Sequence, residues 1–335
     1  MLQFENRTRF AGTMFASPDP DGIDSLYAVV KGTFDLTPDP VLAEEQGPVV
    51  LAAEHYGDPA STSIKTPADV GLVKPATDVL LVGHAYAPNG RPATYVDVWL
   101  SVGAMSKVVR VFGDRHWDTL GVGATISPPE PFQRMPLVWE RAFGGTDEVD
   151  AQPVAENRNP VGTGYRAPKS SKPLDGMPLP NLEDPYAPIT SPRSTPQPAC
   201  FAPVAPHWEP RRSLAGTYDE AWQQTRAPYL PHDFDPRFLQ LAPPGLVAPG
   251  YLRGGEPVEV RGATGAGLLA FRLPAIDVRV TVRLDREQHT LPANLDTVII
   301  EPDVPRLQLV WRAGYASGKK TMRVREIAVD ALDAA

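Results

Sequence analysis

The amino-acid sequence predicts a mainly β protein in which antiparallel sheets form a sandwich-like body. Several segments alternate between apolar and polar residues with a period of two, which is typical of strands that bury one face. Proline, at 39 of 335 residues, excludes helix from much of the chain. A hydrophobic fraction of 42% is sufficient for a sizeable core. We therefore expect few short helices and a long Pro-rich ordered coil beside the sheets.

The predicted strands lie in the first and last thirds of the chain. In residues 276–284 every second residue is Ile, Val or Leu, and the residues between them are Asp, Arg or Thr. Residues 26–36 and 95–102 show the same alternation, so we expect each to have one buried and one solvated face. Further apolar runs predict strands at residues 79–86, 107–112, 295–300, 307–311 and 322–329.

Two turns are predicted between these strands. Asn89-Gly90 lies between two strand-like runs and has the sequence of a tight hairpin connection. Ala104 lies in a second break, so residues 94–112 are expected to fold as another hairpin.

The middle of the chain is rich in proline, and 20 of the 39 prolines lie between Ala151 and Gly250. The same stretch contains several aromatic residues, which disordered linkers lack, so we expect ordered coil. Its one helix is predicted to begin at the capping-box sequence from Thr217 to Glu220 and to end before Pro228. A short helical turn is expected at residues 137–143.

These observations divide the chain into three parts. Residues 1–140 are expected to form an N-terminal antiparallel β layer, and residues 251–335 a C-terminal one. Residues 141–250 form the Pro-rich ordered coil with its short helix. Two layers that share a core make a sandwich, so we expect one integrated domain.

Composition restricts the class of function. A net charge of −8 and a pI near 5.3 argue against nucleic acid, whose phosphates require a basic surface. The single cysteine, Cys200, excludes an internal disulfide and a multi-cysteine zinc site. The first residues are charged where a signal peptide is apolar, and no apolar run reaches the roughly 20 residues of a membrane span. The expectation is a cytoplasmic protein without a membrane partner.

The residues from Gly113 to Asp147 form an unusual run with little periodicity. It contains two aromatic anchors and two pairs in which a carboxylate precedes an arginine, and we identify it as a structural motif made of Asp114, Arg115, Trp117, Trp139, Glu140 and Arg141. The charged residues are expected to form ion pairs or to cap backbone groups near the two tryptophans. If such a pair is buried, Arg141→Ala lowers the melting temperature clearly.

The sequence contains few groups suited to catalysis or metal binding. Cys200 and His207 lack an oxyanion-hole glycine nearby, so a buried, inert cysteine is expected. His232, Asp233 and Asp235 resemble a turn more than a metal site, because they lack a recognised ligand spacing. The carboxylates in the Gly113–Asp147 run lie next to arginines, and a paired carboxylate stays ionised. We therefore predict no catalytic residue, no cofactor and no metal.

A partner surface is predicted in the coil. Trp208, Arg211, Tyr218 and Trp222 are residue types that dominate binding hot spots. The same side chains can also anchor the coil to the sheets, and the sequence leaves both interpretations open.

The motifs together resemble a known family. They are VKGTF from Val30, DVLLVGHAYAP from Asp78, GDRHW from Gly113, PFQRMPLVWERAFGG, NPVGTGY, LPNLEDP, the Trp208 and Arg211 pair, GTYDEAW, LPHDFDPRF and LRGGEPVEV. Their order is similar to that of bacterial domain-of-unknown-function family 2169 over nearly the whole chain. Around Cys200 the family tends towards Gly-Phe-Gly-Pro where this chain has Cys-Phe-Ala-Pro, so the thiol is not expected to be a family catalytic group.

The resemblance implies a function in type VI secretion. Members of that family are thought to act as adaptors or chaperones that load a toxic effector onto the spike of the secretion machine. The expected function is therefore a non-catalytic adaptor with protein partners, namely a secreted effector and spike proteins. Two alternatives remain: a glycoside- or peptide-directed hydrolase that uses Asp, Glu and His of the coil region, and a structural component of the spike.

Overall fold

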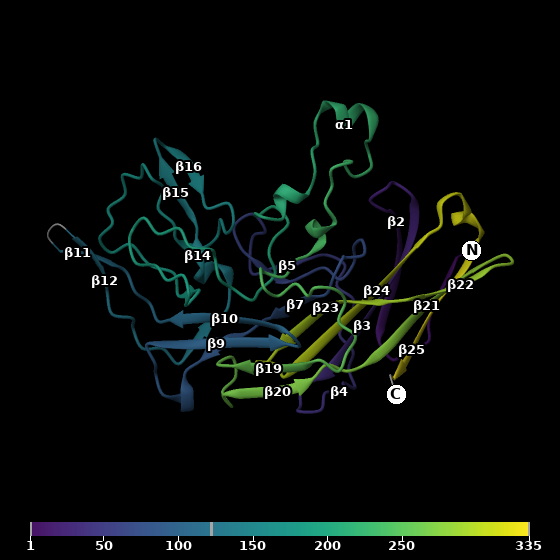
Figure 1. Cartoon of the computed structure of the whole chain (residues 1–335), viewed down its shortest axis with the longest axis horizontal. Coiled ribbons are helices and arrows are strands. Elements are labelled where there is room, and N and C mark those ends of the chain that lie inside the picture. Colours follow the sequence, from purple (N-terminus) through teal and green to yellow (C-terminus); the bar gives the residue numbers. More distant parts are fainter. Residues whose placement is uncertain (1, 121–122, 334–335) are drawn as a thin grey trace.

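The computed structural model describes residues 2–120 and 123–333 (Figure 1). Gly121 and Val122, which belong to the Gly113–Asp147 run, lie outside the described residues. The fold is mainly β, with several antiparallel sheets and a few short helices, which confirms the predicted fold class.

The central element is a six-stranded sheet. Its strands in spatial order are β2 (Ala11–Pro18), β3 (Asp24–Asp35), β24 (Arg306–Ala316), β23 (Asn294–Glu301) and β7 (Asp78–Leu81), with β4 (Val41–Leu42) paired to the end of β3. β23 and β7 are parallel, and the other pairs are antiparallel.

Two smaller sheets pack against it. One contains β1 (Gln3–Asn6), β25 (Val324–Asp333), β21 (Ile276–Leu284) and β22 (Gln288–Pro292). The other contains β18 (Leu182–Glu183), β10 (Met105–Phe112), β9 (Tyr95–Val102), β19 (Pro257–Arg261) and β20 (Leu268–Arg272). Val280 of the first sheet, Val102 of the second and Leu307 of the central sheet belong to one contiguous apolar core. The three sheets therefore form one sandwich-like body.

Strands from the first and last thirds of the chain are interleaved in these sheets. β3 pairs with β24 along eleven residues, and β9 pairs with β19. In Figure 1 the purple strands of the N-terminal third accordingly lie among the yellow strands of the C-terminal third. The shared sheets, and not a stack of two separate layers, hold the two ends of the chain together.

The alternating pattern predicts the buried face correctly for two strands. For a third strand, β3, it predicts one buried face where both faces are buried. β9 and β21 each bury one face, as expected. β3 was predicted to have a solvated face, and this is wrong, because ten consecutive residues of β3 are buried. Residues 43–77 cover the second face, where Lys31 forms an ion pair with Asp69 at 2.9 Å. The charge of Lys31 suggested a solvent-exposed face, but inside the protein this charge is compensated by Asp69.

A second buried ionic cluster fastens the same loop and the coil to the central sheet. Lys74 lies 2.8 Å from Asp78 and 3.2 Å from Asp296, and Arg312 lies 3.3 Å from Asp296. Asp78 also accepts hydrogen bonds from the backbone N–H groups of residues 241 and 242 at 2.9 and 3.1 Å. Since buried charges require partners, this cluster fixes where the loop and the coil lie.

Of the two predicted hairpins, one is confirmed. β9 and β10 pair across a turn at residues 103–104. The hairpin predicted at Asn89-Gly90 is wrong, because β8 (His84–Tyr86) pairs with β13 (Arg134–Pro136) and not with β9. The two residues instead belong to the 3-10 turn η1 (Pro88–Gly90), which carries the chain from one sheet to another. Turn residues permit a reversal, and the sheet partners decide whether it closes a hairpin.

Short two-stranded pairs connect the larger sheets. They are β5 (Glu54–His55) with β6 (Ile64–Thr66), β11 (Trp117–Leu120) with β12 (Gly123–Ile126), β14 (Phe143–Gly144) with β17 (Thr163–Gly164), and β15 (Thr146–Val149) with β16 (Gln152–Ala155). The 3-10 turns are η2 (Trp139–Arg141), η3 (Arg212–Leu214), η4 (Pro236–Leu239) and η5 (Gly318–Arg323). η2 lies within the helical turn predicted at residues 137–143.

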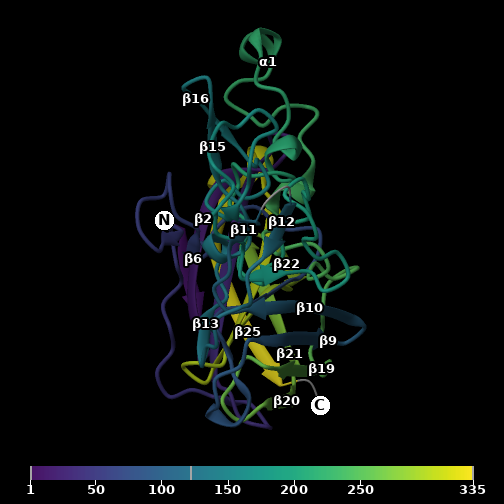
Figure 2. The same ribbon diagram turned by 90° about the vertical axis from the view of Figure 1, so that its left-hand side faces the viewer.

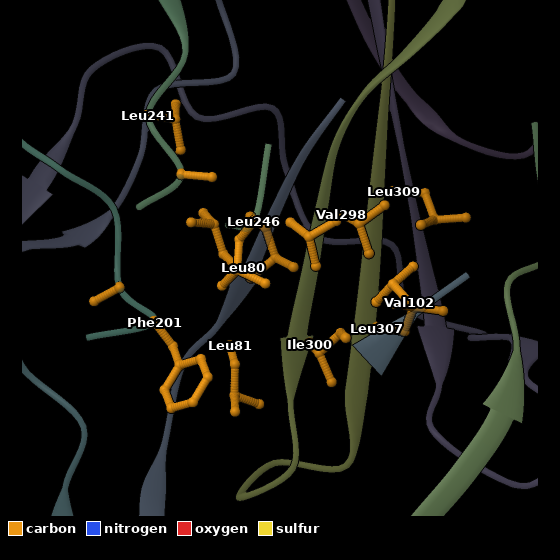
Figure 3. Packing of buried hydrophobic residues seen from close by; sticks show 14 of the residues in the cluster. Leu80, Leu81, Val102, Phe201, Leu241, Leu246, Val298, Ile300, Leu307 and Leu309 are labelled. Atoms are coloured by element: carbon orange, nitrogen blue, oxygen red, sulfur yellow. The ribbon is translucent and has the colours of Figure 1, made fainter. Parts of the chain in front are cut away.

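The Pro-rich coil is part of the core. Cys200, Phe201 and Leu246 are completely buried. Figure 3 shows Leu246 beside Leu80 of β7 and Phe201 beside Leu81, and all four belong to the same apolar core as Leu241. The backbone N–H of residue 79 donates to the carbonyl of Leu246 at 2.9 Å, so the coil covers the outer edge of the central sheet. Proline-rich backbone is therefore ordered here because apolar side chains hold it against the strands.

The one α-helix in the described part of the chain, α1 (Glu220–Thr225), begins later than predicted. Its N-cap is Asp219, whose carboxylate accepts from the N–H of Trp222 at 2.8 Å. Thr217 was the expected cap, but its hydroxyl donates to Asp233 at 2.7 Å. In the described part of the chain, none of the helices combines the length and the apolar character that a membrane span requires.

Candidate functional site

Trp208 is an internal anchor of the coil and not an exposed contact. Its side chain is 1% exposed, and its ring meets that of Trp139 edge to face with centroids 6.0 Å apart. Trp139 is also buried, and its Nε1 donates to the carbonyl oxygens of Ala202 and Pro203 at 3.1 and 2.9 Å. The two tryptophans thus join η2 to the coil. The burial of Trp208 favours the interpretation that it anchors the coil.

Arg211 is likewise engaged inside the coil. Its guanidinium donates to the carbonyl of Val204 and, at 2.9 Å, to that of Phe238, and it lies 5.2 Å from the centre of the Phe238 ring. Burial lowers the pKa of Arg211 to about 10, although the Asp78 carboxylate opposes this. These hydrogen bonds join the two parts of the coil that contain Val204 and Phe238.

Tyr218 and Trp222 are the two proposed contacts that lie at the surface. Tyr218 is 53% exposed, and the two rings meet at an angle with centroids 4.8 Å apart. Trp222 Nε1 donates to the carbonyl of Tyr229, which is itself 38% exposed. Figures 1 and 2 show α1 at the outer end of a loop segment that extends away from the sheets. We call residues 216–235 the aromatic lobe.

Arg226 ties the aromatic lobe to the turn between β2 and β3. Its guanidinium donates to the carbonyls of Pro20 at 2.7 Å, Asp21 at 3.2 Å and Leu230 at 2.8 Å. The same guanidinium lies 5.6 Å from the centre of the Tyr229 ring. The lobe is therefore held in one orientation, and its exposed rings form a preorganised surface. Sequence reasoning identified Tyr218 and Trp222 but missed Arg226 and Tyr229, although Arg226 belongs to the predicted helix and directly follows α1.

The four charged residues of the structural motif contact partners far away in the chain, and not their adjacent residues. Asp114 lies 3.0 Å from Arg141, and both contact Asn181 at 2.9 and 3.0 Å. Glu140 accepts from the backbone N–H and the hydroxyl of Ser63 at 2.7 and 2.8 Å. These contacts hold the run against residues that follow and precede it in the chain.

The buried pair of the run is Arg115 with Glu183. The Arg115 guanidinium contacts the Glu183 carboxylate, donates to the carbonyl of Pro180 at 3.1 Å and stacks 3.7 Å from the centre of the Phe112 ring. Burial raises the pKa of Glu183 and lowers the pKa of Arg115, and their mutual attraction opposes both shifts. Trp117 packs nearby in a second apolar cluster with Phe143, Leu179 and Ile189.

Cys200, Asp233 and Asp235, which resemble catalytic or metal-binding groups, are buried or hydrogen-bonded to nearby residues. Cys200 is fully buried, and burial raises the pKa of its thiol to about 12. A thiol with such a pKa is protonated at neutral pH and is a poor nucleophile. Asp233 caps Thr217 and Asp235 binds Arg237, and hydrogen bonds from these partners hold both carboxyl pKa values below their usual range. Among the described residues, no group of three or more His, Cys, Asp or Glu side chains is arranged to hold a metal ion.

The glycine doublet of the run, Gly144-Gly145, allows close packing of the backbone. A Cβ on Gly144 would lie 2.1 Å from the carbonyl oxygen of Asn159, and one on Gly145 would lie 2.5 Å from that of Gly162. Asn159 itself is buried and donates to the carbonyls of Trp139 and Phe143. These glycines allow two chain segments to touch, which explains them without a phosphate ligand.

A cavity of about 550 Å³ contains a cluster that sequence reasoning missed. At its wall His84 Nδ1 lies 2.6 Å from Asp303, and the same carboxylate accepts from Tyr86 at 2.8 Å and Arg134 at 3.0 Å. Burial disfavours the Asp303 carboxylate, but these hydrogen bonds outweigh it and hold the pKa of Asp303 below its usual value.

Only part of this cluster leaves a trace in the sequence. His84 and Tyr86 occupy alternate positions of β8 and therefore share one face of the strand. Asp303 lies 219 residues from His84, in the turn between β23 and β24, so no local pattern indicates the pairing. A polar face on a short strand was the one available signal.

Comparison with known proteins places the chain in a family. The family model described as "Uncharacterized protein conserved in bacteria (DUF2169)" matches residues 21–312. No curated protein and no solved structure matches the chain. The matched range contains the Gly113–Asp147 run, the whole coil, and both His84 and Asp303. Because the match extends over most of its length, the chain belongs to the bacterial family DUF2169.

Proposed function

We propose that the protein is a non-catalytic adaptor that binds a type VI secretion effector and helps to load it onto the secretion spike. The effector and the spike are inferred as partners from the resemblance of the motifs to the family. The observation that supports the proposal here is the aromatic lobe, in which Tyr218 and Tyr229 are exposed and Trp222 is partly exposed on a segment fixed by Arg226. Tyr and Trp dominate binding hot spots, and a rigid surface loses little entropy when it binds.

The surroundings of the titratable groups favour binding over catalysis. A general acid needs a raised pKa, whereas the pKa values of Asp233, Asp235 and Asp303 are lowered by their hydrogen-bond partners. Glu183 has a raised pKa, but its carboxylate is 3% exposed and holds Arg115. A hydrolase that uses Asp, Glu and His of the coil region is therefore less well supported than an adaptor.

The first experiment identifies the partner. The tagged protein is expressed in its native host and captured, and the proteins that co-purify are identified by mass spectrometry. The proposal predicts a secreted effector in the capture. Capture of spike proteins without an effector, together with obligate oligomers in light scattering, would instead indicate a structural component of the spike.

The second experiment tests the aromatic lobe. Calorimetry with the captured effector is expected to show a loss of about 2 kcal/mol, or roughly thirty-fold in affinity, for Tyr218→Ala. Tyr186→Ala is the matched control, because Tyr186 is 86% exposed and lies outside the lobe. Wild-type affinity of Tyr218→Ala would remove the lobe from the interface, and an equal loss in both variants would show that the effect is not specific to the lobe.

A further inference from the structure

The cavity beside His84 is mostly apolar and opens to solvent through two exposed apolar residues. Its apolar wall is formed by Tyr56, Val82, Pro136, Val138 and Val304. Tyr56 and Val304 are 48% and 56% exposed. Apolar side chains that remain exposed at the mouth of a cavity are typical of a surface that receives another group.

The polar part of the same wall is acidic. It consists of Thr62, His84 and the three carboxylates of Glu140, Glu301 and Asp303, and among the described residues no lysine or arginine lines the cavity. Burial is the main cause of the raised pKa of Tyr56, and the carboxylates of Glu140, Glu301 and Asp303 add to it. The ligand that complements this wall is therefore cationic.

The three carboxylates differ in what compensates them. Glu301 is held by Arg306 at 2.6 Å, and Asp303 by His84 and by Arg134 at 3.0 Å. Glu140 accepts hydrogen bonds from Ser63 alone, and within the described residues it has no cation within ion-pair distance. A carboxylate has about four lone-pair positions, so Glu140 keeps capacity for a charged donor. The cavity wall therefore has one carboxylate, that of Glu140, without a compensating positive charge in the described part of the chain.

We propose that this cavity binds an arginine side chain of the partner polypeptide together with the apolar residue next to it. The guanidinium pairs with Glu140 and the acidic wall, since its planar fork matches a carboxylate. The methylene stem and the neighbouring apolar residue lie against Val304, Pro136 and Tyr56, whose ring also accepts a guanidinium on its face. A volume of about 550 Å³ accommodates two side chains of this size.

The inference rests on the proposed function only for the origin of the arginine, so its chemistry is tested without the effector. The probes are acetyl-leucyl-arginine amide and its neutral isostere acetyl-leucyl-citrulline amide, added to the full chain and followed by ligand-observed NMR. The arginine probe is expected to bind about tenfold more tightly, because a hydrogen bond to a charged group is worth more than a neutral one. Its affinity is expected to fall as salt is added.

A variant that fills the cavity gives the matched test. Val304→Arg places the chain's own guanidinium at the mouth, where an exposed side chain is replaced without cost to the core, and it is expected to abolish binding of the arginine probe. Leu268→Arg adds the same charge at a residue that is 51% exposed on β20 and is expected to leave binding unchanged. Equal binding of the two probes, no binding of either, or undiminished binding by Val304→Arg would each overturn the proposal.

The effector then distinguishes the two proposals. If the captured effector binds wild type and Val304→Arg equally, the cavity is not its arginine site, and the adaptor function stands. If no effector is captured but the arginine probe binds selectively, the cavity chemistry is confirmed, and the adaptor function fails. Loss of effector affinity in Val304→Arg but not in Leu268→Arg supports both.

Discussion

Asp114 and Arg141 lie 27 residues apart in the chain, and their side chains meet at 3.0 Å on the surface of the protein. Each has an oppositely charged neighbour in sequence, Arg115 and Glu140, and neither uses it. Arg115 turns inward to Glu183, and Glu140 caps Ser63. The run from Gly113 to Asp147 is therefore organised by contacts that cross between distant segments.

The two ion pairs of the run are expected to differ in their contribution to stability. Asp114 and Arg141 are 64% and 40% exposed, so Arg141→Ala should cost about 1 kcal/mol and less at high salt. Arg115 and Glu183 are 6% and 3% exposed, and Arg115→Ala leaves a buried carboxylate unpaired at a cost of about 3–5 kcal/mol. Urea unfolding of both variants measures this. A larger loss for Arg141→Ala would contradict the burial described here.

The paired tryptophans offer a comparison of two buried indoles. Trp139 Nε1 donates to two carbonyls, whereas Trp208 Nε1 has no hydrogen-bond partner among the described residues. Trp139→Phe and Trp208→Phe remove the same atoms, but only the first breaks hydrogen bonds. We expect Trp139→Phe to be at least about 1 kcal/mol more destabilising in chemical denaturation. Equal losses would mean that packing alone accounts for both residues.

Gly144 is expected to tolerate no side chain. Its φ is +151°, and a Cβ would lie 2.1 Å from the Asn159 carbonyl oxygen, so Gly144→Ala should cost about 3 kcal/mol or more. Gly176 has φ +73° and nothing within 4 Å of an added Cβ, so Gly176→Ala pays only backbone strain of about 1 kcal/mol. Melting temperatures of the two variants measure the contribution of the close backbone approach. The idea fails if the two variants melt together.

Asp147 should make stability depend on pH. Burial disfavours its charge, but hydrogen bonds from Ser170, Ala167, Glu148 and Lys172 hold its pKa well below the usual value. Because the folded-state pKa is depressed, the stabilisation is complete above the unfolded-state pKa of about 4 and is lost as the pH falls below it.

The measurement for Asp147 is a difference between two proteins. The free energy of unfolding of wild type minus that of Asp147→Asn should be constant near neutral pH and should shrink below about pH 4. Asp39→Asn, which also replaces one carboxylate but at an exposed position, is the matched control. A difference for Asp147→Asn that stays flat to low pH would show that its carboxylate is not stabilised by folding.

Local patterns were sufficient for most strands and for the order of the coil. The period of two identified β9 and β21 with the correct buried faces, and the break at Ala104 identified the β9–β10 hairpin. Aromatic residues among the prolines distinguished ordered coil from a linker. These features depend on neighbours within a few residues, which is the range over which sequence patterns carry information.

The hydrogen-bond and ion-pair partners of many polar side chains could not be predicted, because they lie farther away in the sequence than local patterns extend. Thr217 has the sequence of a cap, but Asp233 competes for its hydroxyl, and Asp219 caps the helix instead. Trp208 and Tyr218 have the same binding-prone chemistry in sequence, yet one is 1% and the other 53% exposed. Residue type indicates what a side chain can do, and burial decides which of these it does.

The sequence by itself determined the mainly β class, the strands with one apolar face and the order of the Pro-rich coil, because each follows from local composition, hydrophobic periodicity and backbone restriction. Only the tertiary structure decided that β3 is buried on both faces, that Arg115 pairs with Glu183 and that His84 meets Asp303 at the wall of a cavity. Those contacts join residues up to 219 positions apart. A buried charge is compensated by whichever opposite charge lies close in space, and the separation of two residues along the chain does not predict that distance.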